Sequence, residues 1–418
     1  MNGEGDAAVR QAVADAHRRE WAYVLAATAR VAGDLDLAEE CVQDAYLAAL
    51  DAWTRQGVPN NPGAWLTTAA RRRALDAHRR ATTLRAKLPL LVEPDAVAPA
   101  EPSEEVIPDD RLRLVFTCCH PALSLEAQVA LTLRLICGLT TTEIANAFLV
   151  PEPTMAARVT RAKKKISAAR IAYRVPEPAE LPDRLDAVLC VVHLLFTTGH
   201  TSPAGDDLVR ADLVDRAIAL ARMLHGLMPD EREASGLLAL LVITDARRAT
   251  RVDDDGRFVL LADQDRSRWD RAAITEGDAL VRDALRGGRP GRFAVQAAIA
   301  ALHAQAPSYA DTDWRQVLGL YDVLAGLWSS PVVELNRTVA LGMVAGPAVA
   351  LARVDELAAD PRLAGYRYLP STRADLLRQL GRDREAAQAY RAALALAANA
   401  AERTFLAGRL AELGERVE

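Results

Sequence analysis

Residues 140–166, TTTEIANAFLVPEPTMAARVTRAKKKI, constrain the fold more than any other stretch of the chain. They read as two short helices separated by a proline-marked turn. Pro151 and Pro153 end the first helix, because proline lacks an amide donor and forces the preceding residue out of the helical region. The turn also contains Leu149. The apolar stripe of the first helix consists of Ile144, Ala145 and Phe148.

The second of these helices restarts at Thr154 and separates an apolar face from a cationic face. Its apolar residues recur at helical spacing and share one predicted buried face: Met155, Val159, Ala162 and Ile166. Polar and cationic residues fall on the other side: Thr154, Arg158, Arg161 and Lys165. From Thr154 to Arg174 there are seven Lys or Arg residues and no acid. The pattern predicts a DNA-binding helix-turn-helix, and the alternative is a helical hairpin with a solvated basic face.

The length and overall composition favour a helical chain with several domains. At 418 residues, the chain is too long for one core, and its 5% aromatic content with abundant Ala, Leu and Arg favours helices. No segment has the roughly 18 consecutive apolar residues of a membrane span, and the acidic start is unlike a signal peptide. Five unevenly spaced cysteines fit a reducing compartment. We therefore expect a cytoplasmic protein without membrane contact.

A second sequence pattern that indicates nucleic-acid binding lies near the N-terminus. Residues 34–53 predict an amphipathic helix with an acidic exposed side, and residues 64–80 predict a helix with a cationic surface. Between Ala69 and Lys87 there are seven Lys or Arg residues and one acid, Asp76. Such a helix binds phosphates, although an arginine-rich helix is often only a solvated face. The intervening loop offers Asn60 and Asn61, whose amides can recognise an unstacked base.

The composition divides the chain into successive segments. Residues 8–88 predict a helical domain, 89–109 an acidic, proline-rich linker, and 110–174 the helix-turn-helix domain. A helical domain at 180–290 follows, with one probable strand or hairpin near 250–262. Residues 291–418 predict a tetratricopeptide-like array, because Ala386, Ala387, Tyr390 and Leu394 follow a Leu-Gly turn at helical spacing. Further helical pairs are expected at 314–328 and 332–344.

The order of these segments resembles the extracytoplasmic-function group of the sigma-70 superfamily, the bacterial promoter-specificity subunits of RNA polymerase. The acidic motif of that family is matched at Gly33, Asp34, Ala38, Glu39, Glu40, Gln43, Asp44, Ala45 and Tyr46. Its −10 block is matched at Pro59, Pro62, Trp65, Leu66, Ala70, Arg71, Arg72, Asp76, Arg79 and Arg80. The sequence segments 116–124, 181–200, 258–270 and 330–340 resemble those of the subgroup with a C-terminal tetratricopeptide-like extension.

The resemblance implies an all-α fold and a role for each segment. It implies binding to core RNA polymerase, at the β′ clamp helices and the β flap, and to promoter DNA. The implied core-binding residues are Asp34, Asp36, Glu39, Glu40, Gln43 and Asp44. The implied −10 contacts are Asn60, Asn61, Gly63, Trp65, Arg71, Arg72, Arg73, His78, Arg79 and Arg80. The implied −35 contacts are Thr154, Ala157, Arg158, Arg161, Lys163, Lys164 and Lys165. The family often has a glycine where this chain has Leu149, so the resemblance implies an altered turn geometry with the fold retained. The acidic linker would thread the polymerase channels in place of RNA, or would be a solvated tether.

The C-terminal extension is expected to regulate the first two domains through an intramolecular contact. Its candidate regulatory interface is Asp263, Asp265, Arg266, Arg268, Trp269 and Asp270, with an internal ion-pair network as the alternative. Cys118, Cys119, His120 and Cys137 lack the spacing of a zinc site, so we expect no metal. The sequence has no phosphate-loop or nucleophile-elbow motif, so we expect no enzyme and no cofactor. Two other functions stay open: a stand-alone helix-turn-helix regulator, and a helical-repeat scaffold whose basic helices are incidental.

Overall fold

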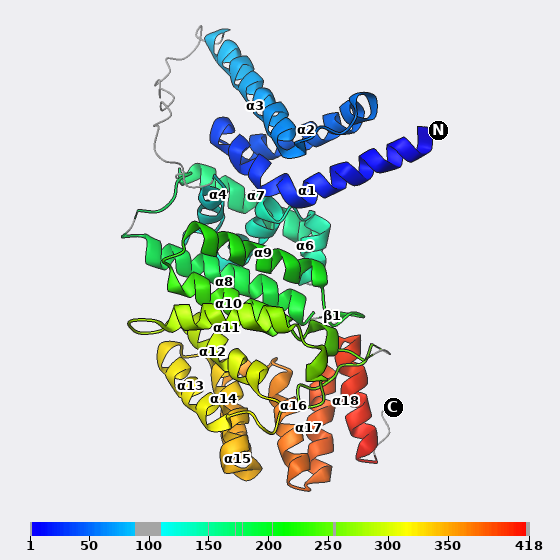
Figure 1. Cartoon of the computed structure of the whole chain (residues 1–418), viewed down its shortest axis with the longest axis vertical. Helices are drawn as coiled ribbons and strands as arrows, with labels where there is room; N and C mark the ends of the chain where they lie inside the picture. The colour runs from blue at the N-terminus through cyan, green and yellow to red at the C-terminus, as the bar shows by residue number, and fades with distance from the viewer. Residues whose placement is uncertain are drawn as a thin grey trace. The chain divides into compact units, whose positions relative to one another are not determined.

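The computed structural model describes residues 2–87, 110–148, 150–171, 173–177, 179–202, 204–253 and 256–414. The expected linker at 89–109 and the turn residue Leu149 lie outside the described residues. The chain divides into two compact units, residues 1–191 and 192–418. In the described ranges the regular structure is almost entirely helical, which confirms the all-α prediction (Figure 1). In the same ranges, no helix combines the length and apolar character needed to cross a bilayer.

The first unit begins with three helices, α1 (Asn2–Ala32), α2 (Leu35–Gln56) and α3 (Pro62–Lys87). Two polar side chains fix where α2 and α3 start. The Asp34 carboxylate accepts a hydrogen bond from the Leu37 amide at 2.9 Å, and the Asn61 side chain accepts one from the Ala64 amide at 3.0 Å. Trp53 is fully buried in the core of these helices. The capped starts fix which faces of α2 and α3 turn outward.

The second part of this unit contains the predicted helix-turn-helix. Its elements are α4 (Asp110–Cys118), α5 (Leu125–Leu131), the π-helical turn η1 (Thr132–Ile136), α6 (Thr141–Phe148) and α7 (Glu152–Ala168). Thr140 and Glu143 form a reciprocal capping box that starts α6, with the Thr140 amide donating to the Glu143 carboxylate at 2.6 Å. Ile144 and Ala145 are buried as predicted, and the side chain of Phe148 is outside the described set.

Helix α7 confirms the predicted apolar face, because Met155, Val159, Ala162 and Ile166 are its buried residues. The helix begins at Glu152 and not at Thr154. Pro153 causes this difference, because proline is tolerated in the first turn of a helix, where amide groups have no intrahelical acceptor.

The two parts of the first unit pack against each other through α1. The Trp21 indole Nε1 donates to the Leu135 carbonyl at 3.0 Å, and the Tyr173 hydroxyl donates to the Ala26 carbonyl at 3.0 Å. Gly138 has a φ of +68°, and a Cβ at this position would lie 3.0 Å from the Trp21 ring. A glycine therefore permits both the turn and the close approach of the indole.

The second unit is a succession of helices, and Figure 1 shows α16, α17 and α18 standing side by side. The unit boundary falls within α8 (Leu181–His200). The following helices are α9 (Ala211–Leu227), α10 (Arg232–Asp245), α11 (Arg271–Leu285), α12 (Arg292–Gln305), α13 (Trp314–Leu327), α14 (Pro331–Ala345), α15 (Pro347–Leu357), α16 (Tyr368–Gln379), α17 (Asp383–Leu396) and α18 (Ala400–Glu412), with single 3₁₀ turns η2 (Arg248–Thr250), η3 (Arg266–Arg268) and η4 (Pro361–Leu363). The predicted Leu-Gly turn lies between α16 and α17, where Gly381 has a φ of +68°, and Ala386, Ala387 and Tyr390 of α17 are buried as their helical spacing predicts. The assignment to a tetratricopeptide-like repeat stays a prediction.

Extended structure is smaller than predicted near 250–262 and also occurs where none was expected. The predicted hairpin reduces to one antiparallel bridge between Val252 and Phe258. The amide of Arg257 donates to the Asp253 side chain at 2.8 Å, so this donor is used within the local turn. Elsewhere β1 (Ala204–Gly205) pairs in parallel with β2 (Ala398–Asn399). No local sequence pattern indicated this pairing, because its strands are only two residues long and far apart in the chain.

Candidate nucleic-acid interface

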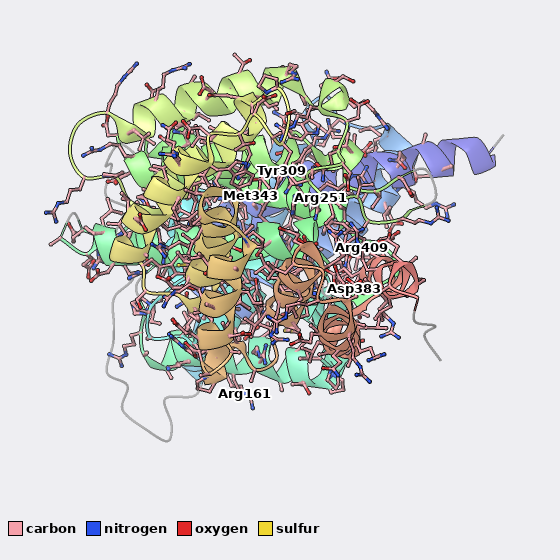
Figure 2. All side chains as sticks on the ribbon, turned by 90° about the horizontal axis from the view of Figure 1, so that it is seen from below. Arg161, Arg251, Tyr309, Met343, Asp383 and Arg409 are labelled. Atoms are coloured by element: carbon pink, nitrogen blue, oxygen red, sulfur yellow. The ribbon has the colours of Figure 1, made fainter. Side chains whose placement is uncertain are left out.

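The outer face of α7 carries most of the predicted cationic side chains. Thr154, Ala157, Arg161, Lys164 and Lys165 are exposed, and Arg158 is half-buried. Arg161, one of these exposed side chains, is labelled in Figure 2. Because the opposite face of α7 is buried by its apolar stripe, these side chains can contact a DNA groove without disturbing the core.

Lys163 differs from its neighbours on α7. Its side chain is only 9% exposed, and its Nζ donates to Asp36 Oδ1 at 2.7 Å and to Glu39 Oε2 at 2.6 Å. Burial lowers the pKa of Lys163, but the carboxylates of Glu39 and Asp36 outweigh this effect and raise it. In this arrangement the Lys163 ammonium is committed to α2 and does not face solvent with Lys164 and Lys165.

Glu39 corrects one sequence-based expectation. The acidic exposed side predicted for residues 34–53 includes Glu39, but the structure buries Glu39 to 5% exposure. Two cations from elsewhere in the unit surround its carboxylate: Lys163 of α7, and Arg134 of η1, whose guanidinium forms an ion pair with it. A buried carboxylate requires such partners, since an unpaired charge in an apolar setting is strongly destabilising.

The other predicted core-binding residues lie on the surface of α2. Asp34, Asp36, Glu40, Gln43 and Asp44 are all exposed. Asp34 also caps the helix, and the Gln43 amide donates to Glu39 Oε1 at 3.3 Å. An acidic surface therefore exists on α2, and Glu39 supports it from beneath.

Helix α3 presents the second cationic surface. Arg71, Arg72, Arg79 and Arg80 are exposed, whereas Arg73 is half-buried, with its Nε 3.9 Å from Asp44 Oδ2 of α2. The buried face consists of Leu66, Ala70 and Ala74. Leu75 is apolar but 47% exposed, because Ala74 takes the inward position next to it.

His78 holds a structural position that the sequence pattern did not reveal. Its Nε2 lies 3.0 Å from the carbonyl oxygens of Val31 and Ala32, so the ring donates its proton to the end of α1. The last carbonyls of a helix have no intrahelical donor, and a histidine there satisfies them. His78 therefore links α3 to α1 in addition to any contact it makes with DNA.

The remaining predicted −10 contacts lie in the loop before α3 and in the first turn of α3. Asn60 and Asn61 are exposed, and the Asn61 side chain also caps α3. Gly63 is buried, and a Cβ there would lie 2.6 Å from the Glu20 carboxylate. Trp65 is half-buried with its ring edge-to-face against Trp53 at 5.8 Å. A side chain at position 63 would therefore require the flexible Glu20 side chain to move.

The predicted regulatory cluster in the second unit is built from helix caps and carbonyl contacts. Arg266 is buried and donates to the carbonyls of His303 and Ala306, the latter at 2.8 Å, and its guanidinium lies 4.6 Å from the Trp269 ring centroid. Asp265 caps η3 and Asp270 caps α11. Asp263 and Arg268 are exposed. The alternative to a regulatory interface was an internal ion-pair network. In the described part of the cluster, the side chains contact backbone groups instead.

The cysteine and histidine residues near α4 do not assemble into a ligand set. Cys118, Cys119 and Cys137 are buried free thiols, and burial raises the pKa of Cys119 to about 12. Across the ranges that the structure describes, no group of three His, Cys, Asp or Glu residues has the geometry to hold a metal ion. We assign these thiols to the core.

Comparisons with known proteins match three parts of the chain. Residues 16–83 match the family model "Sigma-70 region 2", residues 113–166 match "Sigma-70, region 4", and residues 184–285 match a family of unknown function, DUF6596. An uncharacterized protein of Rhizobium meliloti is 44% identical over 386 residues, which cover 91% of this chain and 90% of that protein. A "Probable ECF RNA polymerase sigma factor SigI", recorded for two strains of Mycobacterium tuberculosis, is 31% identical over 172 residues, 40% of this chain and 58% of that protein. No solved structure matches the chain.

Proposed function

Because the chain belongs to the extracytoplasmic-function group of the sigma-70 family of RNA polymerase sigma factors, we propose that it recruits core polymerase through α2 and reads promoter DNA through α3 and α7. In this proposal, α7 enters the major groove of the −35 element. The loop at 57–61 and α3 bind the −10 element and help to melt it. The nucleotidyl-transfer chemistry belongs to the polymerase.

The observation that carries this proposal is the exposure of two separate cationic surfaces in the same unit. Arg161, Lys164 and Lys165 project from α7, while Arg71 and Arg72 project from α3. Arginine and lysine neutralise phosphates, and arginine also binds guanine edges in the major groove. Two cationic helices fit a two-site promoter contact better than the single contact of a stand-alone helix-turn-helix regulator.

The acidic surface of α2 supports a role in binding the polymerase. Asp36, Glu40 and Asp44 are exposed on one helix whose opposite face is buried. DNA repels such a surface, so it suits a protein partner. We assign it to the β′ clamp helices of the polymerase.

The test is run-off transcription with purified bacterial core polymerase and the full chain. Glu40→Lys should abolish both core binding and initiation, because it reverses one charge of the acidic surface without touching the core of α2. Asp51→Lys is the matched control, since Asp51 is an exposed acid of the same helix that lies outside the family motif. It should leave core binding within about twofold of the unchanged chain.

Three results would contradict the proposal. If the chain does not increase transcription initiation at any promoter, the sigma function is refuted. Specific promoter footprints without core polymerase would favour the stand-alone regulator. Equal losses in the Glu40→Lys and Asp51→Lys variants would refute the assignment of the acidic motif to polymerase binding.

The C-terminal unit is proposed to modulate this activity in cis. Its match to a separate family and its own hydrophobic cores support a distinct role. A chain ending at Val175, before α8, tests this role in the same transcription assay. Higher activity would mean that the extension inhibits and lower activity that it is required, whereas equal activity at every promoter would refute modulation in cis.

A further inference from the structure

Two adjoining cavities lie among the helices of the second unit. The inner cavity, of about 440 Å³, is lined by residues of α8, α10, α12, α13 and α14. Its walls are largely apolar, with Leu240, Ile243, Ile299, Leu324 and Val333 among them, and two indoles, Trp269 and Trp328, add aromatic surface. This volume falls in the range of small-molecule sites, which are mostly apolar with a few polar groups.

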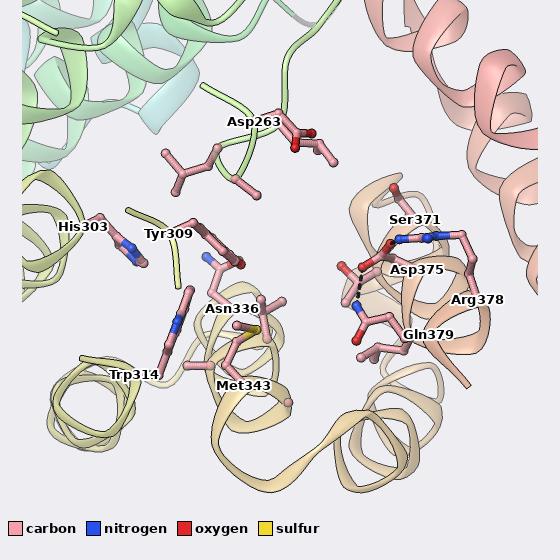
Figure 3. A pocket seen from close by; sticks show the side chains of 18 of the residues that line it. Asp263, His303, Tyr309, Trp314, Asn336, Met343, Ser371, Asp375, Arg378 and Gln379 are labelled. Atoms are coloured by element: carbon pink, nitrogen blue, oxygen red, sulfur yellow. Dashed lines mark hydrogen bonds and ion pairs between the residues drawn. The ribbon is translucent and has the colours of Figure 1, made fainter. Parts of the chain in front are cut away.

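The outer cavity, of about 550 Å³, shares Leu261, His303, Tyr321 and Asn336 with the inner one. Figure 3 shows His303, Tyr309 and Trp314 on one side of it and Asp375, Arg378 and Gln379 on the other. The cations there are already paired: Arg378 donates to Asp375 at 2.8 Å, and Arg409 pairs with Glu412 at 2.9 Å. Asp375 also accepts from Gln379 at 2.7 Å, and the other charged residue of the lining is the exposed acid Asp263. The outer cavity therefore offers a ligand little net charge.

Arg247 gives the inner cavity a different character. No carboxylate lines that cavity, and the described residues provide Arg247 with no ion pair. Its guanidinium donates instead to the amide oxygen Oε1 of Gln264 at 3.5 Å. The adjacent Arg248 shows the contrast, since it binds Asp215 at 2.6 Å and Asp245 at 2.7 Å. Burial lowers the pKa of Arg247 to about 10, so it stays charged near neutral pH. A cation on an apolar cavity wall without a counter-ion is costly, and an anionic ligand would offset that cost.

The polar groups near Arg247 are uncharged at neutral pH. Burial, assisted by nearby arginines, lowers the pKa of His193 and of His303 to about 4. The Nδ1 atom of His303 is buried and has no hydrogen-bond partner. Neutral imidazoles provide hydrogen bonds to a ligand without adding charge. The charge of the inner cavity at neutral pH is therefore that of one guanidinium.

We propose that the inner cavity binds a small organic monocarboxylate with an apolar or aromatic body, and that Arg247 holds its carboxylate. A guanidinium presents paired N–H groups that match a carboxylate in a bidentate geometry. A phosphate dianion would leave one negative charge uncompensated among apolar walls, so the single cation favours a monoanion. The apolar walls and the two indoles then accommodate the body of the acid.

The test measures binding to the full chain by isothermal titration calorimetry, without polymerase, so its outcome is independent of the sigma function. The probes are phenylacetate, octanoate, the neutral amide phenylacetamide, and inorganic phosphate. We expect at least one of the two carboxylates to bind, and a carboxylate to bind at least about tenfold more tightly than phenylacetamide, because the amide lacks the charge-assisted contact. This comparison uses the unchanged chain and does not depend on how any variant folds.

Variants locate the site. Arg247→Met keeps an apolar stem and should weaken carboxylate binding at least about tenfold. The matched control, Arg289→Met, removes an exposed arginine that lines neither cavity and should leave binding unchanged. Ala300→Leu narrows the inner cavity and should also weaken binding, while circular dichroism reports that the helices are retained. The proposal is overturned if neither carboxylate binds, if the amide or phosphate binds as tightly, or if Arg247→Met and Ala300→Leu both bind like the unchanged chain.

Discussion

At the scale of single residues, Lys163 has a different role from the other cations of α7. Its ammonium lies between Asp36 and Glu39, and Glu39 is buried. We predict that Lys163→Met lowers the free energy of unfolding by about 1–3 kcal/mol, because Glu39 then loses one of its two cationic partners. The loss stays below the roughly 3–5 kcal/mol of a fully unpaired buried charge, since Arg134 remains. Urea unfolding followed by circular dichroism measures it.

Lys164 provides the control for this prediction, because it is the next residue and is exposed. Lys164→Met should change the free energy of unfolding by no more than about 0.5 kcal/mol. The same variant should instead weaken binding to duplex DNA. The slope of log affinity against log salt concentration should fall by about the contribution of one phosphate contact. If the two variants lose equal stability, the ion-pair assignment of Lys163 is wrong.

At the scale of elements, the sequence predicted which face of a helix is buried better than it predicted which residues a side chain contacts. The apolar spacing of α7 determines which side of the helix is buried, and all four predicted residues are buried there. The spacing cannot distinguish Lys163 from Lys164, because the difference comes from Glu39, which lies 124 residues away in the chain. Arg266 is a similar case: its charge suggested an ion pair, but its partners are carbonyls at the end of α12, 37 and 40 residues away. Such long-range contacts depend on the fold and leave no local pattern.

Helix crossings in the second unit depend on a glycine at the closest approach. A Cβ on Gly236 of α10 would lie 2.6 Å from the Ala294 amide nitrogen of α12. We predict that Gly236→Ala destabilises the chain by more than about 2 kcal/mol, because the obstacle is backbone and α10 and α12 must separate. Differential scanning calorimetry measures the shift in the transition.

Gly226 of α9 is the matched helical control, because nothing lies within 4 Å of a Cβ built there. Gly226→Ala should be neutral, or stabilising by up to about 1 kcal/mol, since alanine has the higher helix propensity and restricts the unfolded chain. Similar destabilisation by both alanine substitutions would show that the α10–α12 crossing tolerates a side chain.

At the scale of the whole molecule, buried histidines should make stability depend on pH. His193, His200 and His303 all lie in the second unit, and burial lowers the pKa of each one. Neighbouring arginines reinforce the effect: Arg292 acts on His193, Arg251 on His200, and Arg247 and Arg266 on His303. The folded state therefore keeps these rings neutral at a pH where the unfolded chain already protonates them.

The sign of the pH dependence follows from this difference. Above the ordinary histidine pKa of 6.5, folded and unfolded chains bind the same number of protons at these rings, and their contribution to stability is fully present. As the pH falls from about 6.5 toward about 4, the unfolded chain takes up protons that the folded chain excludes, and stability decreases by about 1.4 kcal/mol per pH unit for each such ring. Circular dichroism melts of the full chain at successive pH values in this window should therefore show a falling midpoint. His193→Gln, which removes one titrating ring, should reduce the slope. A midpoint that stays constant or rises on acidification would refute the burial of neutral histidines in this unit, and an unchanged slope in His193→Gln would remove His193 from the group responsible.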